Sequence, residues 1–273
     1  MKNRSFKIAL TSFLFCSSAF SQLQQYDGFA YTVGSTLAGN GTWTNLNSGT
    51  APVIASGNLT VSGLQPPTGE RVSWVSGNIQ EAWDLLGSTN SSGTLYYSFA
   101  FQLTSIPTTA TYSFGFTGSS TTYGSTVWLT NSGTSFSIGV AARSSATALV
   151  YDTATFTTND LIFLVGSYEF VSGATNNDIS RLWINPSSAD FGANSAPLST
   201  LVITNVAAGT DLTNGINGFL LRGANGSPAG TMDELRIGTD WASVTPVPEP
   251  STYAMLALAG AGFAGYVIRR RRR

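Results

Sequence analysis

The sequence predicts an all-β protein built as a two-sheet antiparallel sandwich. Apolar and polar residues alternate with a period of two through much of the chain, as in strands that face a core on one side. Turn-forming segments rich in Gly, Ser, Thr and Asn separate these runs, and the chain holds 29 glycines. Helical periodicity is weak throughout, and we expect no more than one helical turn, at residues 80–86.

The clearest strand spans residues 94–103, where five apolar side chains alternate with smaller or polar ones. The five on the core-facing side are Leu95, Tyr97, Phe99, Phe101 and Leu103. The same alternation predicts two more sets of core-facing residues, namely Tyr112, Phe114 and Phe116, and Phe136, Ile138 and Val140. Further strands are expected at 53–61, 71–75, 126–130, 161–170, 179–185, 201–204, 218–222 and 231–237.

Residues 22–245 contain no composition break, charge block or proline-rich spacer, so we expect one sandwich domain there. This region has five arginines, no lysine and thirteen acids, a net charge of −8. Nucleic-acid binding needs clustered basic residues, so we expect no nucleic-acid partner. The chain has no histidine, which excludes histidine-dependent catalytic triads and histidine zinc sites.

The N-terminus has the features of an export signal over residues 1–21. A start with three basic residues precedes an apolar stretch at 8–15 and small residues at Ala19 and Ser21, just before the expected cleavage. Cys16, the chain's one cysteine, falls in this leader, so the mature protein is expected to have no disulfide.

The C-terminus has the features of a membrane stop. A proline-rich linker at 246–252 precedes an uncharged apolar segment at 253–268, which we expect to be a short transmembrane helix. The basic tail that follows predicts a cytoplasmic end and an exported domain. The tail consists of Arg269, Arg270, Arg271, Arg272 and Arg273.

A short motif, the apolar helix and the arginine tail occur here in a specific order. The motif is Val247, Pro248, Glu249, Pro250 and Ser251. This C-terminal segment resembles the PEP-CTERM protein-sorting signal of bacteria with an outer membrane. The resemblance implies processing by an exosortase, with the motif as its recognition element. It also implies passage through an inner-membrane-anchored intermediate to the cell surface or matrix, in species that make exopolysaccharide.

A second resemblance lies in the predicted first and last strands. Residues 26–31 (YDGFAY), 182–186 (LWINP) and 232–238 (MDELRIG) are similar to strands of concanavalin A-like or laminin-G-like jelly rolls. That resemblance implies a jelly-roll topology with adjoining terminal strands. It also implies a fold that often carries a calcium ion or a glycan.

The carboxylates give no convincing catalytic pair, so we expect no enzymatic activity. Asp233 and Glu234 are adjacent on a predicted strand and should project to opposite faces, whereas retaining glycosidases hold two carboxyl groups about 5 Å apart. We expect Asp233 on the side of Leu235 and Ile237. The resemblance makes Asp27 its natural partner in a calcium site. The alternative is that Asp233 accepts backbone N–H bonds or pairs with an arginine.

Three aromatic residues lie on the predicted side opposite the aliphatic set: Tyr96, Trp128 and Trp183. An aromatic ring beside hydrogen-bonding side chains suits a sugar, so these residues are candidate glycan contacts; the alternative is a secondary core. The sequence thus predicts an exported structural or glycan-binding protein that interacts with polysaccharide. Two alternatives remain open: a carboxylate-dependent polysaccharide hydrolase or lyase, and an adhesion protein without a small ligand.

Overall fold

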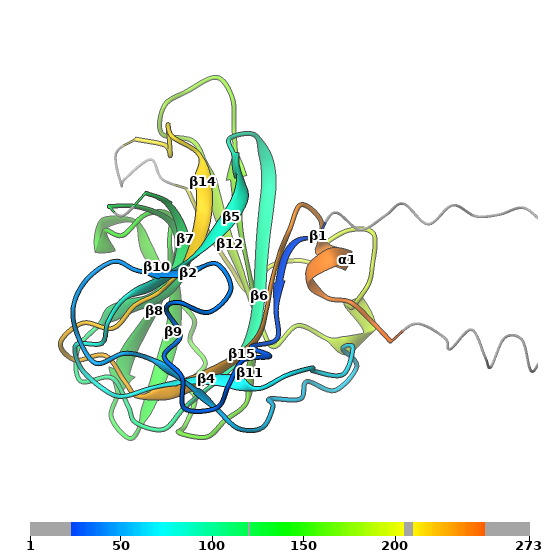
Figure 1. The fold of residues 1–273 in the computed structure, drawn as a ribbon. Coiled ribbons are helices and arrows are strands. Elements are labelled where there is room, and N and C mark those ends of the chain that lie inside the picture. Colours follow the sequence, from blue (N-terminus) through cyan, green and yellow to red (C-terminus); the bar gives the residue numbers. More distant parts are fainter. Residues whose placement is uncertain (1–22, 120, 205–209, 249–273) are drawn as a thin grey trace, which may run out of the picture.

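A computed structural model of the chain describes residues 23–119, 121–204 and 210–248, and these residues form two antiparallel sheets packed face to face (Figure 1). Sheet A contains β1 (Leu23–Asp27), β3 (Val53–Ala55), β4 (Arg71–Trp74), β6 (Gly93–Leu103), β11 (Ile162–Phe170), β12 (Ile179–Ile184), β13 (Leu201–Thr204) and β15 (Gly230–Gly238). Sheet B contains β2 (Trp43–Asn45), β5 (Ala82–Asn90), β7 (Thr111–Ser119), β8 (Thr122–Ser132), β9 (Ser135–Ala141), β10 (Leu149–Tyr151) and β14 (Ile216–Leu221). The predicted two-sheet sandwich is confirmed.

The strand order in sheet A is β13-β12-β11-β6-β15-β4-β3, and β1 also pairs with β15. In sheet B the order is β10-β9-β8-β7-β14-β5-β2. The first and last strands are therefore neighbours, as the jelly-roll resemblance implies. A short helix, α1 (Trp241–Val244), and two 3₁₀ turns, η1 (Ala146–Ala148) and η2 (Ser188–Asp190), complete the described elements.

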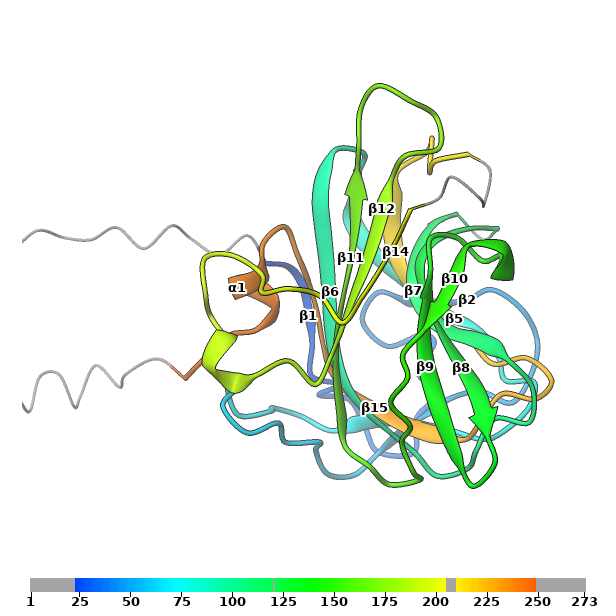
Figure 2. The same cartoon turned by 180° about the vertical axis from the view of Figure 1, so that it is seen from behind.

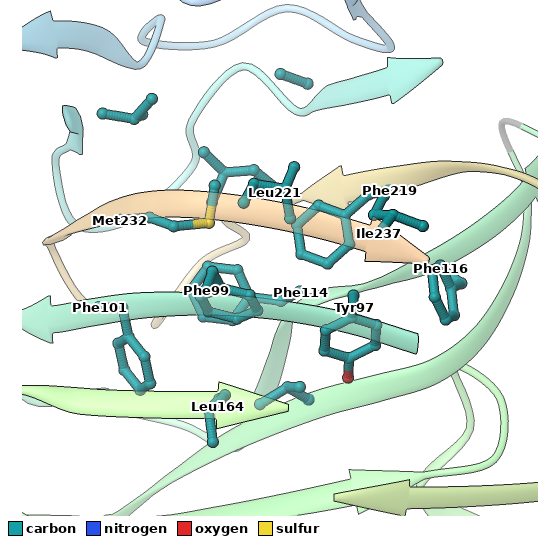
Figure 3. Close-up of a cluster of buried hydrophobic side chains, with 14 of the residues drawn as sticks. Tyr97, Phe99, Phe101, Phe114, Phe116, Leu164, Phe219, Leu221, Met232 and Ile237 are labelled. Atoms are coloured by element: carbon teal, nitrogen blue, oxygen red, sulfur yellow. The ribbon is translucent and has the colours of Figure 1, made fainter. Parts of the chain in front are cut away.

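The core lies between the sheets and is dominated by aromatic rings (Figure 3). The alternating residues of β6 all point into it, as predicted, and each is at most 1% exposed. Phe99 is central: its ring centroid lies 4.7 Å from that of Phe114 and 5.6 Å from that of Phe219. Since each sheet supplies one inward face of alternate residues, this core fixes which side chains remain on the two outer faces.

A second hydrophobic cluster lies on the outer side of sheet A, where α1 and the segment 185–199 cover β6, β11 and β12 (Figure 2). Trp241 of α1 packs on Trp183 of β12 with 5.2 Å between ring centroids. Asp240 caps the helix by accepting a hydrogen bond from the Ser243 N–H. Sheet A is thus partly covered on its outer face.

Two of the predicted elements differ in the structure. Residues 80–86, expected to form a helical turn, belong largely to β5, because that stretch pairs with β14 on one side and β2 on the other. Of the strand expected at 53–61, only β3 forms. Gly57 has a φ of +86°, a backbone conformation that ends an extended run.

Two β-bulges place side chains on faces that strict alternation does not predict. A register shift between Tyr112 and Phe114 turns Tyr112 to the outer face of sheet B, although we expected it in the core. In β15, Glu234 has a φ of +58° and the register shifts between Asp233 and Arg236. Asp233 therefore lies on the outer side of sheet A, and the expectation that it shares a side with the core residues that follow it is wrong.

Several predictions concern residues outside the described ranges. These are the leader at 1–21, the transmembrane helix at 253–268, the arginine tail, and Glu249, Pro250 and Ser251 of the sorting motif. Within the described ranges, no helix has the length and apolar character needed to span a bilayer. Val247 and Pro248 are described and exposed, and the carbonyl oxygen of Pro246 before them accepts a hydrogen bond from the Gln65 N–H, 2.8 Å away.

Candidate functional site

Trp128 lies on the outer face of sheet B, within a row of aromatic side chains that crosses the strands. The indole is 8% exposed, and its ring centroid lies 5.5 Å from that of Tyr112 on β7. Tyr123, at the start of β8, packs against Tyr112 with 5.7 Å between ring centroids. The Trp128 indole N–H donates to the Thr126 hydroxyl, 3.1 Å away, which fixes the orientation of the ring.

Tyr151 of β10 extends this row to the edge of sheet B. In the strand register, Gly139 of β9 lies opposite both Tyr151 and Trp128. A Cβ atom added at Gly139 would lie 2.6 Å from Cδ1 of Tyr151, so the tyrosine ring occupies the space above the glycine. Glycine at this position therefore lets the Tyr151 ring lie against the sheet beside Trp128.

An ion pair continues the row past Tyr112. The Arg222 guanidinium carbon lies 4.2 Å from the Tyr112 ring centroid, and Arg222 Nε lies 2.8 Å from Glu81 Oε1. We call Tyr112, Tyr123, Trp128, Tyr151 and the pair Arg222–Glu81 the aromatic row. With strands about 4.8 Å apart, the rings from β10 to β7 cover roughly 14 Å.

The electrostatics of the aromatic row favour neutral phenol groups. Burial raises the pKa of Tyr123 to about 12, and it also raises the pKa of Tyr112. Burial raises the pKa of the Glu81 carboxyl as well, against the opposing effect of Arg222. A general base works best with a pKa near the operating pH, so these shifts do not prepare either tyrosine to remove a proton.

Tyr96 and Trp183 lie on the other outer face, that of sheet A, and so they are not joined to Trp128. Their ring centroids are 6.0 Å apart, and both line a hollow of about 270 Å³. Trp183 is only 3% exposed because it belongs to the second hydrophobic cluster, and its indole N–H donates to the Pro197 carbonyl, 2.9 Å away. The three predicted glycan contacts therefore fall into two separate places.

The carboxylates of Asp27 and Asp233 are buried, and both oxygens of each accept hydrogen bonds from the protein. Asp27 accepts from the Phe29 N–H at 2.7 Å, the Tyr31 hydroxyl at 2.9 Å and the Trp43 indole N–H at 2.8 Å. Asp233 accepts hydrogen bonds from the backbone N–H groups of Leu59 and Glu234, each 2.8 Å from a carboxylate oxygen.

This arrangement does not fit a calcium site shared by the two carboxylates, because a calcium ion needs six to eight oxygen ligands. It corresponds instead to the alternative in which Asp233 accepts backbone N–H bonds. Across the described part of the chain, no three or more Asp, Glu, His or Cys side chains gather as a potential metal site. The calcium site therefore stays an expectation of the sequence alone.

Comparison with protein families identifies the C-terminal segment. Residues 246–273 match the model of the PEP-CTERM protein-sorting motif, which confirms the predicted sorting signal. The motif implies an exported protein that passes through a membrane-anchored intermediate and is processed by an exosortase. A comparison with curated proteins finds no match.

Comparison with solved structures supports the sandwich fold. The globular domain of T. cruzi calreticulin matches with a TM-score of 0.51 and 9% identity, covering 91% of this chain and 99% of that one. An endo-β-1,4-glucuronan lyase from the fungus Trichoderma reesei has a TM-score of 0.44 and 16% identity, covering 82% and 98%. A CBM2 module from the evolved Dit of Lactobacillus casei BL23 phage J-1 has a TM-score of 0.41 and 9% identity, covering 82% and 97%.

Sequence reasoning placed Trp128 on the outer face but missed its neighbours in the aromatic row. Tyr112 was assigned to the core because the bulge in β7 leaves no clear mark in the alternation. Tyr151 lies on the short edge strand β10, which was not predicted. Gly139 is the sequence signal for the position of Tyr151, since a glycine inside a strand often marks a place where another group approaches the backbone closely.

Proposed function

We propose that this protein is an exported, non-catalytic component of the cell surface or extracellular matrix that binds polysaccharide through the aromatic row. The observation that supports this most is the alignment of Tyr151, Trp128 and Tyr112 across β10 to β7 on the outer face of sheet B. Tyr112 and Tyr151 are partly exposed and can contact sugar rings, while Trp128 lies between them and packs against Tyr112. The adjoining ion pair of Arg222 and Glu81 can donate and accept hydrogen bonds with sugar hydroxyl groups.

The charge of the domain favours a neutral polymer. The region 22–245 carries a net charge of −8, which repels polyanions over distances comparable to the Debye length. Arg222, the cation that belongs to the aromatic row, is already paired with Glu81 at 2.8 Å. We therefore expect stronger binding to uncharged glucans than to uronic-acid polymers.

The binding test uses the full-length protein, purified in detergent, with hydroxyethyl cellulose, dextran and alginate as probes. Trp128→Ala should weaken binding to the best of these by at least about fivefold, because truncation of a central aromatic side chain costs more than about 1 kcal/mol. Val33→Ala is the control, since Val33 is a 51% exposed side chain on the loop after β1, outside the aromatic row. Equal affinity of the wild type and Trp128→Ala would contradict the proposal, provided that circular dichroism shows both to be folded.

The alternative function, a carboxylate-dependent hydrolase or lyase, is tested with the same three polymers. Hydrolysis needs two carboxyl groups flanking the glycosidic bond, and Glu81 supplies one that is held by Arg222. We expect no new reducing ends and no absorbance from unsaturated sugar products. Turnover that is lost in Glu81→Gln but kept in Val33→Ala would establish the alternative.

A further inference from the structure

The hollow beside Tyr96 is a second polar and aromatic pocket on the molecule, distinct from the aromatic row. Its volume is about 270 Å³, which is near the lower end of the range for small-ligand sites and suits one or two sugar rings. Strands β6, β11 and β12 form one side, and the loop before β13 forms the other. The lining residues are Thr94, Tyr96, Glu169, Arg181, Trp183, Ala196, Pro197, Leu198 and Ser199.

The polar groups of this hollow converge on neighbouring strands. Arg181 Nη1 lies 2.5 Å from Glu169 Oε2, and both side chains remain about one-third exposed, so the pair retains further hydrogen-bonding capacity. Ser167 lies in register between Tyr96 and Arg181 and is fully buried.

The rim of the hollow is shaped for contact with a ligand. Leu198 is 96% exposed. The loop that carries it is nevertheless fixed to the sheet, because the Pro197 carbonyl accepts a hydrogen bond from the Trp183 indole N–H. The Tyr96 ring packs against Trp183, so it is supported from behind. An apolar side chain and a supported ring on opposite walls of a polar pocket match the amphipathic surface of a sugar ring.

The two sites face away from each other. Tyr96 projects outward from sheet A and Trp128 projects outward from sheet B, while the core between them joins the inner faces. Packed sheets are about 10 Å apart, and side chains add to that thickness on both outer faces. A polymer strand lying on the aromatic row therefore cannot reach the hollow on sheet A without passing around the sandwich.

We propose that the hollow of Tyr96, Glu169 and Arg181 is a second saccharide-binding site, so that one molecule bridges two neutral polysaccharide chains. This inference rests on the proposed function of the aromatic row and adds to it the ability to cross-link. Each bridge links two polymer strands, and many bridges along the strands produce a network by multivalent binding. The protein then acts as a matrix cross-linker.

The test compares binding with bridging, using the full-length protein in detergent and the same three polymers. Binding is measured on immobilised polymer, and bridging is measured as the rise in viscosity of the polymer in solution. We expect the wild type to do both. Arg181→Ala and Tyr96→Ala should bind immobilised polymer within about threefold of the wild type but lose most of the viscosity increase.

The control variant Val33→Ala should retain both properties. Arg181→Ala keeps the same C-terminal tail as the wild type, so any bridging by association of tails would persist in that variant. Wild-type protein that binds without raising viscosity, or Arg181→Ala that bridges as well as the wild type, overturns the cross-linking inference alone. Absence of binding to all three polymers overturns the proposed function and the inference together.

Discussion

The buried carboxyl of Asp84 should make the fold more stable in mild acid than at neutral pH. Asp84 is fully buried on β5, and one of its oxygens has no hydrogen-bond partner among the described residues. The other oxygen accepts from the Thr42 hydroxyl and from the Gln25 amide, 3.3 Å away. Burial, with a further contribution from the nearby Asp27 carboxylate, raises the pKa of Asp84 from 3.8 to about 6.

The direction of the pH effect follows from this shift. A carboxyl whose pKa is higher in the folded than in the unfolded state binds its proton more tightly when folded. Its stabilising contribution is full below about pH 4 and is lost as the pH rises through about 6. The shift from 3.8 to about 6 is about 2 pKa units, and each unit corresponds to about 1.4 kcal/mol. Ionisation of Asp84 therefore lowers the unfolding free energy by up to about 3 kcal/mol at pH 8, relative to mild acid.

The measurement is urea unfolding of the full-length protein at pH 4.5, 6 and 8, followed by tryptophan fluorescence. Asp84→Asn should reduce the loss of stability between pH 4.5 and 8, because the amide keeps an acceptor and cannot ionise. Asp152→Asn, a change at a partly exposed acid after β10, should leave the wild-type slope intact. Wild-type stability that is constant or rises from pH 4.5 to 8, or an Asp84→Asn slope equal to that of the wild type, would refute the reasoning.

Other expected outcomes follow from the core, the aromatic row and the buried acids. Phe99→Ala should lower the unfolding free energy by roughly 3–5 kcal/mol in urea titrations, because it leaves a cavity at the centre of the sandwich. Gly139→Val should displace both the Tyr151 ring and the Val150 carbonyl, which lie 2.6 and 2.7 Å from an added Cβ, and so weaken polysaccharide binding several-fold in the immobilised-polymer assay. Chelation with EDTA should leave the melting temperature unchanged, because protein donors already satisfy Asp27 and Asp233; a fall of several degrees would show a bound metal.

The sequence predicted the strands whose alternation is long and regular, and β6 is the clearest of them. It failed where a local backbone feature overrides the period of two. The bulge at Glu234 reverses the side on which Asp233 lies, and the bulge beside Tyr112 moves that ring from the core to the aromatic row. Both effects depend on pairing with a neighbouring strand, which a single segment does not encode.

The candidate sites show the same limit. Alternation placed Trp128 and Trp183 on outer faces correctly, because that property is local to each strand. It could not show that the two indoles lie on different sheets, since that depends on the order of all the strands. The sorting motif, by contrast, was fully readable, because its recognition depends on contiguous residues and on composition.

The position of β15 bears on when this chain can fold. This last strand sits in the middle of sheet A, between β6 and β4, and also carries β1. Sheet A therefore stays split until nearly the whole polypeptide has been synthesised. This topology is compatible with an export route that threads unfolded chains, because the two ends cannot meet before the polypeptide is nearly complete.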